Sequence, residues 1–312
     1  MNVVRTAEEL EPARRAAAIG TFDGVHRGHR RVLDAARAAG LRTVVVTFDP
    51  HPRSMFGTPV ELLTPLERRI ELLEEAGADD VLVLRFDERL ASLEPEEFAD
   101  SVLRAAGIEA VAAGDGFRFG RGRSGDLALL ERAGFDVRRV PLVDNVSSSH
   151  IRRLLAAGDV EAAARLLGRP PEVEGIVVHG DHRGRLLGFP TANLQAPPGV
   201  LVPKLGIYAG ATRVAGSVGG KAADARPEDR VAHGDPGGHR SAISIGTNPT
   251  YGGTERRAEA HLLDFDGDLY GQRLVVELWA HLRDEAAFSS EEDLVEAIAA
   301  DCARARTVAR PA

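Results

Sequence analysis

The first half of the chain alternates nearly continuous apolar runs with segments in which apolar residues recur every three or four positions. Residues 16–19 and 42–48 are short runs rich in alanine and β-branched residues, the pattern of strands buried on both faces. Residues 28–39 carry their apolar side chains on one helical face and are followed by Gly40, a common helix terminator. The pattern predicts a strand, a helix and a second strand in turn.

The same alternation continues to residue 167. We expect strands at 80–86, 109–113 and 136–141, and helices at 65–76, 95–106, 126–133, 149–156 and 160–167. Strands and helices that alternate over roughly 140 residues predict an α/β, Rossmann-like domain with a parallel, doubly wound sheet.

The pattern changes at Gly168-Arg169-Pro170-Pro171, and we place a domain boundary there, with domains at 1–169 and 170–312. Beyond it, short strand-like segments separated by glycine and proline predict a small antiparallel β-barrel. We expect its strands at 174–178, 206–211, 242–245, 258–265 and 274–280, and a closing helix at 290–304. Residues 215–240 are rich in Gly, Asp, Arg and His, which predicts a mobile surface loop.

Composition narrows the class of protein. The 312 residues are 44% hydrophobic and 28% charged, an ordinary globular balance, and the net charge of −8 argues against nucleic-acid and membrane-surface binding. The one cysteine, Cys302, excludes a disulfide framework and a cysteine-based zinc site. The acidic start lacks a signal-peptide core, and no apolar run approaches the ~20 residues of a membrane helix. We expect a cytoplasmic protein; a homo-oligomer is compatible with the sequence.

A glycine-rich segment, Gly20-Thr21-Phe22-Asp23-Gly24-Val25-His26-Arg27-Gly28-His29, joins the first predicted strand to the first predicted helix. Ligands of such sheets bind at the carboxyl ends of strands, where helix N-termini offer N–H groups to anions. The glycines let the backbone approach a phosphate, and the two imidazoles can stabilise charge on a transferred group. This H-x-G-H pattern indicates nucleotidyl transfer. The alternative is a glycine-rich turn with two surface histidines.

Other segments should lie at the same edge of the sheet, namely 47–53, 114–122 and 146–152. Ser147, Ser148 and Ser149 open a predicted helix, where serines bind a ligand or cap the helix. Four arginines supply enough positive charge for a triphosphate, and a solvated charged surface is the alternative for each of them. They are Arg118, Arg121, Arg123 and Arg152.

The second half contains its own glycine-rich segment, at 179–193, with Gly180, Gly184 and Gly188. It ends in Pro190-Thr191-Ala192-Asn193, and in an extended chain Thr191 and Asn193 face the same way. Hydroxyl and amide oxygens suit Mg²⁺ that is already held by ATP phosphates. Taken alone, this tetrapeptide is more often an ordinary turn.

Glu259 alternates with His261 in the predicted strand 258–265, so that Glu259, His261 and Leu263 share one face. The carboxylate is either an exposed surface group or a working group directed into a cleft. His179 and His182 have a metal-like spacing without an evident third ligand. We expect Trp279 in the barrel core and Cys302 as a small buried residue.

Nine segments carry a resemblance to a known family. They are GTFDGVHRGH (20–29), TFDPHPR (47–53), LLTPLERRIELL (62–73), FRFGRGRSGD (117–126), SSSHIRRLL (147–155), GRLLGFPTANL (184–194), GIYAG (206–210), IGTNPTYGG (245–253) and EAHLLDFDGDLYG (259–271). In this order, over nearly the whole chain, they resemble the bifunctional bacterial riboflavin kinase/FMN adenylyltransferases, also called FAD synthetases.

The resemblance implies that the first domain transfers AMP from ATP to FMN, giving FAD and pyrophosphate. It implies ATP or phosphate contacts from Gly20, Phe22, Asp23, Gly24, His26, His29, Ser147, Ser148 and Arg152. His26 and His29 are then catalytic.

For the second domain, the resemblance implies a riboflavin kinase that produces FMN. Glu259 is then the base on the ribityl 5′-hydroxyl, and Thr191 and Asn193 hold Mg²⁺. Flavin or ATP contacts are implied for Gly180, Gly184, Gly188, Thr191, Asn193 and Asn248. The expected ligands are Mg²⁺ and the small molecules riboflavin, FMN and ATP.

Two residues depart from the family pattern. His150 stands where an arginine usually follows the serine motif, and Gly116 replaces an Asn or Asp. A histidine is mostly neutral at pH 7 and cannot replace a permanently charged arginine evenly. Two alternatives therefore stay open: a riboflavin kinase with a degenerate first domain, and a nucleotidyltransferase with a changed nucleotide or flavin analogue. A third alternative is a flavin-binding regulator without turnover, against which the intact Thr191, Asn193 and Glu259 argue.

Overall fold

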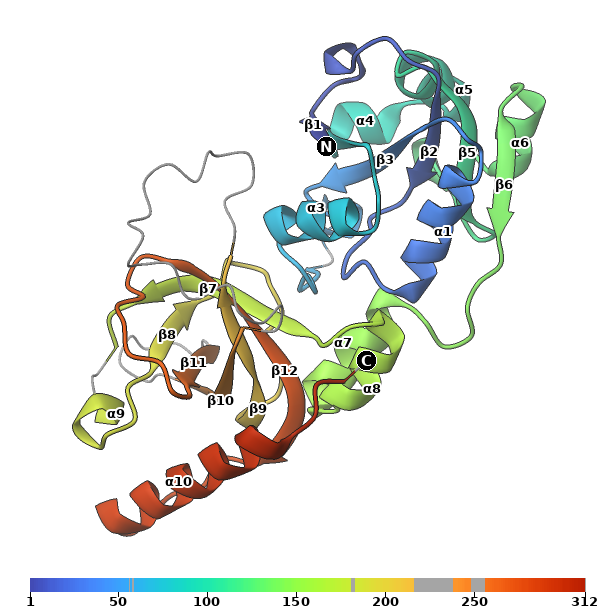
Figure 1. The fold of residues 1–312 in the computed structure, drawn as a ribbon. Coiled ribbons are helices and arrows are strands. Elements are labelled where there is room, and N and C mark those ends of the chain that lie inside the picture. Colours follow the sequence, from blue (N-terminus) through green and yellow to red (C-terminus); the bar gives the residue numbers. More distant parts are fainter. Residues whose placement is uncertain (56, 58, 181–182, 216–237, 248–255, 312) are drawn as a thin grey trace. The chain divides into compact units, whose positions relative to one another are not determined.

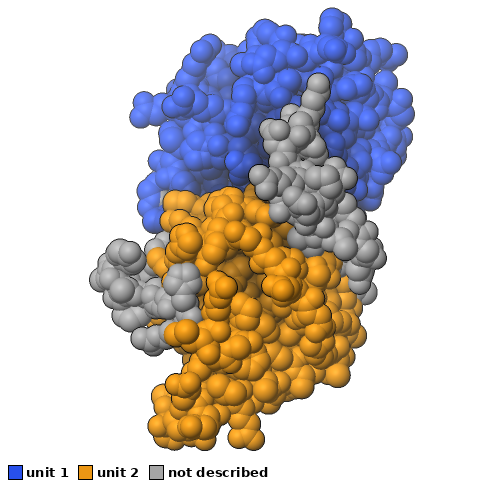
Figure 2. All heavy atoms as spheres, turned by 60° about the vertical axis from the view of Figure 1, so that its left-hand side comes forward, with its two compact units in different colours: residues 1–148 blue, residues 149–312 orange. Residues whose placement is uncertain are grey.

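The computed structural model describes all residues except 56, 58, 181–182, 216–237, 248–255 and 312 (Figure 1). The chain forms two compact units, Met1–Ser148 and Ser149–Ala312, coloured separately in Figure 2. Asn248, His182 and most of the predicted loop 215–240 lie outside the described residues. Within the described residues, no helix is both long and apolar enough to cross a membrane.

The first unit contains a six-stranded sheet in the order β1-β4-β3-β2-β5-β6, with every pair parallel. Its strands are β1 (Asn2–Val4), β2 (Arg15–Ile19), β3 (Arg42–Asp49), β4 (Asp80–Arg85), β5 (Ile108–Gly114) and β6 (Asp136–Val140). The parallel sheet predicted from the sequence is confirmed. Strand β1 was not predicted, because three residues are too few to show a period.

Helices cover both faces of this sheet. They are α1 (Arg27–Arg37), α2 (Pro52–Met55), α3 (Leu66–Glu75), α4 (Glu88–Ser92), α5 (Pro95–Phe98) and α6 (Leu127–Arg132), with short helical turns η1 (Ala7–Glu9), η2 (Ala99–Arg104) and η3 (Arg121–Arg123). Along β2, Ala16 and Ala18 join one buried cluster and Ala17 and Ile19 join the other. A strand buried on both faces must be apolar throughout, which explains the run seen in the sequence.

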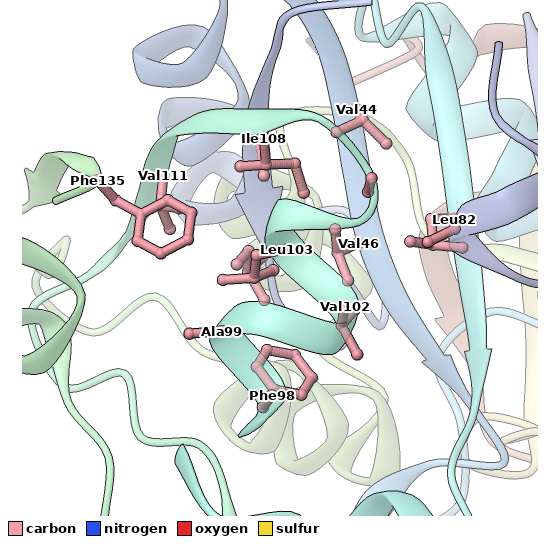
Figure 3. Packing of buried hydrophobic residues seen from close by; sticks show 14 of the residues in the cluster. Val44, Val46, Leu82, Phe98, Ala99, Val102, Leu103, Ile108, Val111 and Phe135 are labelled. Carbon is pink, nitrogen blue, oxygen red and sulfur yellow. The ribbon is translucent and has the colours of Figure 1, made fainter. Parts of the chain in front are cut away.

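The helix predicted over 95–106 begins as α5 and continues as the π-helical turn η2. Its Phe98, Val102 and Leu103 side chains lie in the same buried cluster as Val46 and Leu82 of the sheet (Figure 3). The apolar spacing therefore placed the segment correctly against the sheet, although it did not reveal the wider turn.

The strand order identifies the point where ligands of such sheets bind. From β2 the chain proceeds outward through β3 and β4, and then returns to place β5 on the other side of β2. The carboxyl ends of β2 and β5 thus flank the topological switch point. The glycine-rich loop 20–26 and the loop 115–126 both begin at this edge.

The second unit contains a closed antiparallel barrel in the order β10-β11-β8-β7-β12-β9. Its strands are β7 (Glu172–Val178), β8 (Ala192–Gln195), β9 (Gly206–Val214), β10 (His239–Thr247), β11 (Arg256–Leu262) and β12 (Arg273–Arg283). Its helices are α7 (Ser148–Ala157), α8 (Val160–Leu167), α9 (Arg183–Leu186) and α10 (Glu291–Thr307), with α7 starting at the last residue of the first unit. The predicted barrel and its C-terminal helix are confirmed.

The helices α7 and α8 contact the barrel unit. The N–H of Lys204 donates to the carbonyl of Leu155 at 3.0 Å, and α8 packs against β12. The compact second unit therefore begins about one helical hairpin before the boundary that we place after residue 169, which remains a prediction. Helix α8 ends at Leu167 and is capped by Gly168, whose φ of 75° is left-handed.

The predicted strand 258–265 extends beyond the end of the observed strand β11. Strand β11 ends at Leu262, and Asp264 has a φ of 58°, so the chain turns before residue 265. Leu263 therefore does not continue the strand face of Glu259, and that expectation was wrong. Trp279 and Cys302 are buried as expected, and the Trp279 indole donates to the buried carboxylate of Glu277 at 2.8 Å.

Candidate active sites

The loop after β2 has an unusual backbone. Phe22 and Val25 have φ values of 51° and 39°, and Gly24 between them has 84°. A non-glycine residue in this region is strained, and it persists only where its surroundings hold it. Both side chains are buried in the cluster that includes Leu33 of α1, which supplies that hold.

Asp23 ties the loop to the segment preceding α3. One carboxylate oxygen accepts the N–H of Leu63 at 2.9 Å and that of Thr64 at 3.2 Å, and the N–H of Gly24 donates to the Thr64 hydroxyl at 3.2 Å. The Asp23 side chain is 0% exposed and that of Phe22 is also buried. These two residues can contact a nucleotide only through their main chain, because their side chains face the interior.

Arg69 of α3 anchors the start of the same loop. Its guanidinium donates to the carbonyl of Thr21 at 2.8 Å and to that of Phe48 at 3.3 Å, and Asp49 lies 3.9 Å away. The side chain is 1% exposed, and burial lowers the pKa of Arg69. Our sequence reasoning did not single out this residue. The detectable feature is that its charge lies three and four residues from Leu66, Leu72 and Leu73, on an apolar face of the helix.

The two histidines of the loop lie together at the start of α1. His26 caps the helix, and its Nδ1 accepts the N–H of His29 at 3.2 Å. The two rings stack with centroids 3.6 Å apart. Because Nδ1 of His26 is an acceptor, the proton of the neutral ring is on Nε2, which makes that atom a donor. Gly28 leaves room for this ring, since a Cβ there would meet Cε1 of His26 at 3.1 Å.

The serine motif also reaches this loop. The Ser148 hydroxyl donates to the carbonyl of Asp23 at 2.9 Å. Ser147 precedes α7, while His150 and Arg152 lie within its first turns. At least Ser148 therefore does more than cap a helix, because its hydroxyl fixes a loop distant in sequence.

Arg118 and Arg121, from the set of candidate arginines, are paired with carboxylates. Arg118 lies 3.3 Å from Asp126, and Arg121 forms an ion pair with Glu94. These side chains are substantially exposed, so their pairs are weak and can exchange for a ligand.

The barrel brings together the three residues predicted for phosphoryl transfer. Asn193 in β8 is directly opposite Glu259 in β11, and the Thr191 hydroxyl donates to Oε2 of Glu259 at 3.3 Å. Their neighbours Ala192, Ala258 and Ala260 are buried, whereas all three polar residues are half-buried. Strand alternation thus directs a hydroxyl, an amide and a carboxylate to one outer face of the barrel.

Glycines shape the segment that leads to this cluster. A Cβ at Gly180 would lie 2.5 Å from Cγ of Asn193, and one at Gly184 would lie 2.4 Å from the carbonyl oxygen of Phe189. Gly188 has a φ of 87° just after α9. Side chains cannot be accommodated at Gly180 and Gly184, and their absence lets the segment pack closely against residues 189–193.

His179 and His182 have a metal-like spacing in the sequence, without an evident third ligand. The ring of His179 packs against Tyr270 with centroids 4.1 Å apart, and His182 lies outside the described residues. No group of three or more His, Cys, Asp or Glu side chains with metal-binding geometry occurs in the described part of the chain.

The fold and its two polar clusters define a class: a nucleotidyltransferase-type domain followed by a kinase-type barrel. Comparison with family models agrees. Residues 8–152 match the FAD synthetase family, and residues 167–309 match the riboflavin kinase family.

Relatives that match over nearly the whole chain show the family to which it belongs. Proteins named bifunctional riboflavin kinase/FMN adenylyltransferase are 39% identical in Pseudomonas fluorescens (100% of this chain, 99% of the relative) and 38% identical in Escherichia coli K12 (92% and 90%). The namesake from Listeria monocytogenes is 34% identical (95% and 93%). The chain belongs to the family of bifunctional riboflavin kinase/FMN adenylyltransferases. Enzymes of this family use ATP with riboflavin and FMN, and form FMN and FAD.

A solved structure supports the two-domain fold over the whole length. The crystal structure of a Streptococcus pneumoniae protein named as a macrolide-efflux protein superposes with a TM-score of 0.83 at 28% identity, covering 98% of this chain and 99% of that one.

Proposed function

We propose that the barrel phosphorylates riboflavin and that its active-site residues are Thr191, Asn193 and Glu259. The observation that carries this proposal is the 3.3 Å contact between the Thr191 hydroxyl and the Glu259 carboxylate, with Asn193 opposite Glu259 in the ladder. The half-buried carboxylate is accessible to a substrate hydroxyl while still held by its neighbours.

Glu259 acts as the general base. Its carboxylate takes the proton of the ribityl 5′-hydroxyl as that oxygen bonds to the γ-phosphorus of ATP and the bond to the β-phosphate oxygen breaks, releasing ADP. Phosphoryl transfer depends mainly on positioning and charge stabilisation. The fixed cross-strand position of Glu259 supplies the positioning.

The donor set fits Mg²⁺. Thr191 and Asn193 offer neutral oxygens, and Glu259 adds a charged one within 3.3 Å of the Thr191 hydroxyl. We assign Thr191 and Asn193 as the residues that hold the cation together with ATP phosphates. When bound, Mg²⁺ neutralises phosphate charge. Gly180 keeps the Asn193 amide close to the glycine-rich segment.

In the first unit, we propose that FMN is adenylylated at the start of α1. A phosphate oxygen of FMN bonds to the α-phosphorus of ATP, and pyrophosphate leaves. N–H groups at the N-terminus of α1 and the Nε2–H of His26 donate to the phosphates as charge develops. His29 stacks on His26 and contributes the second imidazole.

Reciprocal variants test both assignments in the full-length chain. We expect Glu259→Gln to abolish FMN formation from riboflavin but to spare FAD formation from supplied FMN. We expect His29→Ala to lower FAD formation by about 100-fold or more, the usual contribution of such a group, and to spare FMN formation. Chromatography of flavin products measures both. Loss of both activities in either folded variant would contradict the separate sites.

A further inference from the structure

His261 makes a short contact with the backbone beside the proposed metal ligand. Its Nδ1 lies 2.7 Å from the carbonyl oxygen of Pro190, and its ring meets the Phe189 ring edge-on at 5.5 Å. A carbonyl oxygen only accepts hydrogen bonds, so Nδ1 must carry the proton. This contact fixes both the tautomer and the orientation of the imidazole.

The contact between His261 and Pro190 lies just beyond the last paired residues of strands β8 and β11. The register pairs Ala258 with Leu194, Glu259 with Asn193 and Ala260 with Ala192. The next position of this register sets His261 opposite Thr191, but β8 begins only at Ala192. The backbone of Thr191 is therefore outside the paired part of β8 and β11. The hydrogen bond from the His261 imidazole to the Pro190 carbonyl holds the chain there instead of strand pairing.

We propose that His261 is a positioning residue of the kinase site, which fixes the Pro190–Thr191 peptide and thereby the direction of the Thr191 hydroxyl. This inference rests on the proposed function of the Thr191, Asn193 and Glu259 cluster. Two residues of strand β11 then act at the kinase site. Glu259 contacts the substrate hydroxyl, and His261 positions the segment that contacts the nucleotide.

Two variants separate the hydrogen bond from the rest of the ring. An asparagine places its amide N–H near the position of Nδ1, whereas a glutamine places it near Nε2. His261→Asn can therefore keep the bond to Pro190, and His261→Gln cannot keep it in the same place. His261→Ala removes it altogether. FAD formation from supplied FMN, measured on the same preparations, reports on intact protein independently of the kinase site.

We expect His261→Gln and His261→Ala to raise the KM for ATP in FMN formation about tenfold, the effect of one lost hydrogen bond, with a smaller change in kcat. We expect His261→Asn to stay within about threefold of the parent enzyme. FAD formation should be unchanged in all three variants.

Equal losses in the Asn and Gln variants, or no loss in either, would overturn the positioning role. A loss confined to kcat would overturn it as well, since a misdirected Thr191 affects nucleotide binding first. Thr191→Ala and Glu259→Gln serve as parallel variants. If both retain full FMN formation, the proposed kinase site is wrong; if they lose it while His261→Gln does not, only the role of His261 is wrong.

Discussion

The two sites are built by different means. In the first unit, the working residues lie on a loop with two strained non-glycine residues, held by buried polar anchors from α3 and the segment before it. In the barrel, Asn193 and Glu259 lie within paired strands, and their separation follows from the ladder itself. Sheet hydrogen bonds position side chains without added help, whereas an irregular loop needs dedicated contacts. The first site should therefore depend more on residues remote from its chemistry.

The largest effect should follow the loss of the buried anchor. Arg69→Met leaves the carbonyls of Thr21 and Phe48 without their guanidinium donor and should destabilise the first unit by about 3 kcal/mol. We expect FAD formation to fall sharply while FMN formation persists, and urea unfolding with both assays measures this. Arg37→Met on α1, an arginine that is 54% exposed, is the control and should behave like the parent. Equal behaviour of the two variants would refute the anchoring role.

A smaller effect should arise where the barrel site depends on close approach. Gly180→Ala places a methyl 2.5 Å from Cγ of Asn193 and must displace that amide. We expect FMN formation to fall by about tenfold, as for a binding group misplaced by a small distance, with FAD formation from FMN unchanged. The control is Gly199→Ala. Its methyl group meets no atom within 4 Å, so this variant has only the backbone strain of a left-handed φ of 76° and no steric clash. A similar loss in the control would remove the steric explanation.

The smallest effect concerns the serine motif. His150→Arg restores a permanent positive charge in the first turn of α7, after Ser148. We expect FAD formation to rise a few-fold, because a guanidinium keeps its charge and can form two hydrogen bonds to a phosphate. Initial rates of FAD formation from supplied FMN measure the change. An unchanged rate would mean that residue 150 does not meet the nucleotide.

The helices and strands of both units can be predicted from local sequence patterns. The contacts between residues distant in sequence depend on how the strands are arranged and cannot be predicted in that way. Ala16–Ile19 is visible as a buried strand, because every neighbour along it is apolar. The chemistry of Thr191 and Glu259 is equally visible, but their contact joins residues 68 apart and depends on the register of two strands. Arg69 and its partner Thr21 are 48 residues apart, and no period in the sequence reports which carbonyl an arginine will meet. The turn at Asp264 was missed because the apolar residues Leu263 and Phe265 follow directly and made the strand seem longer than its paired part.

Closure of the barrel has a consequence for how this enzyme tolerates divergence. Each strand has a neighbour on both sides, so sliding β8 by one residue would break two ladders at once and turn Asn193 toward the interior. Substitutions elsewhere in the wall can alter packing, but they cannot easily shift this alignment. The spacing between the Asn193 amide and the Glu259 carboxylate should therefore be preserved as the sequence diverges, because all strands of the closed barrel maintain it together.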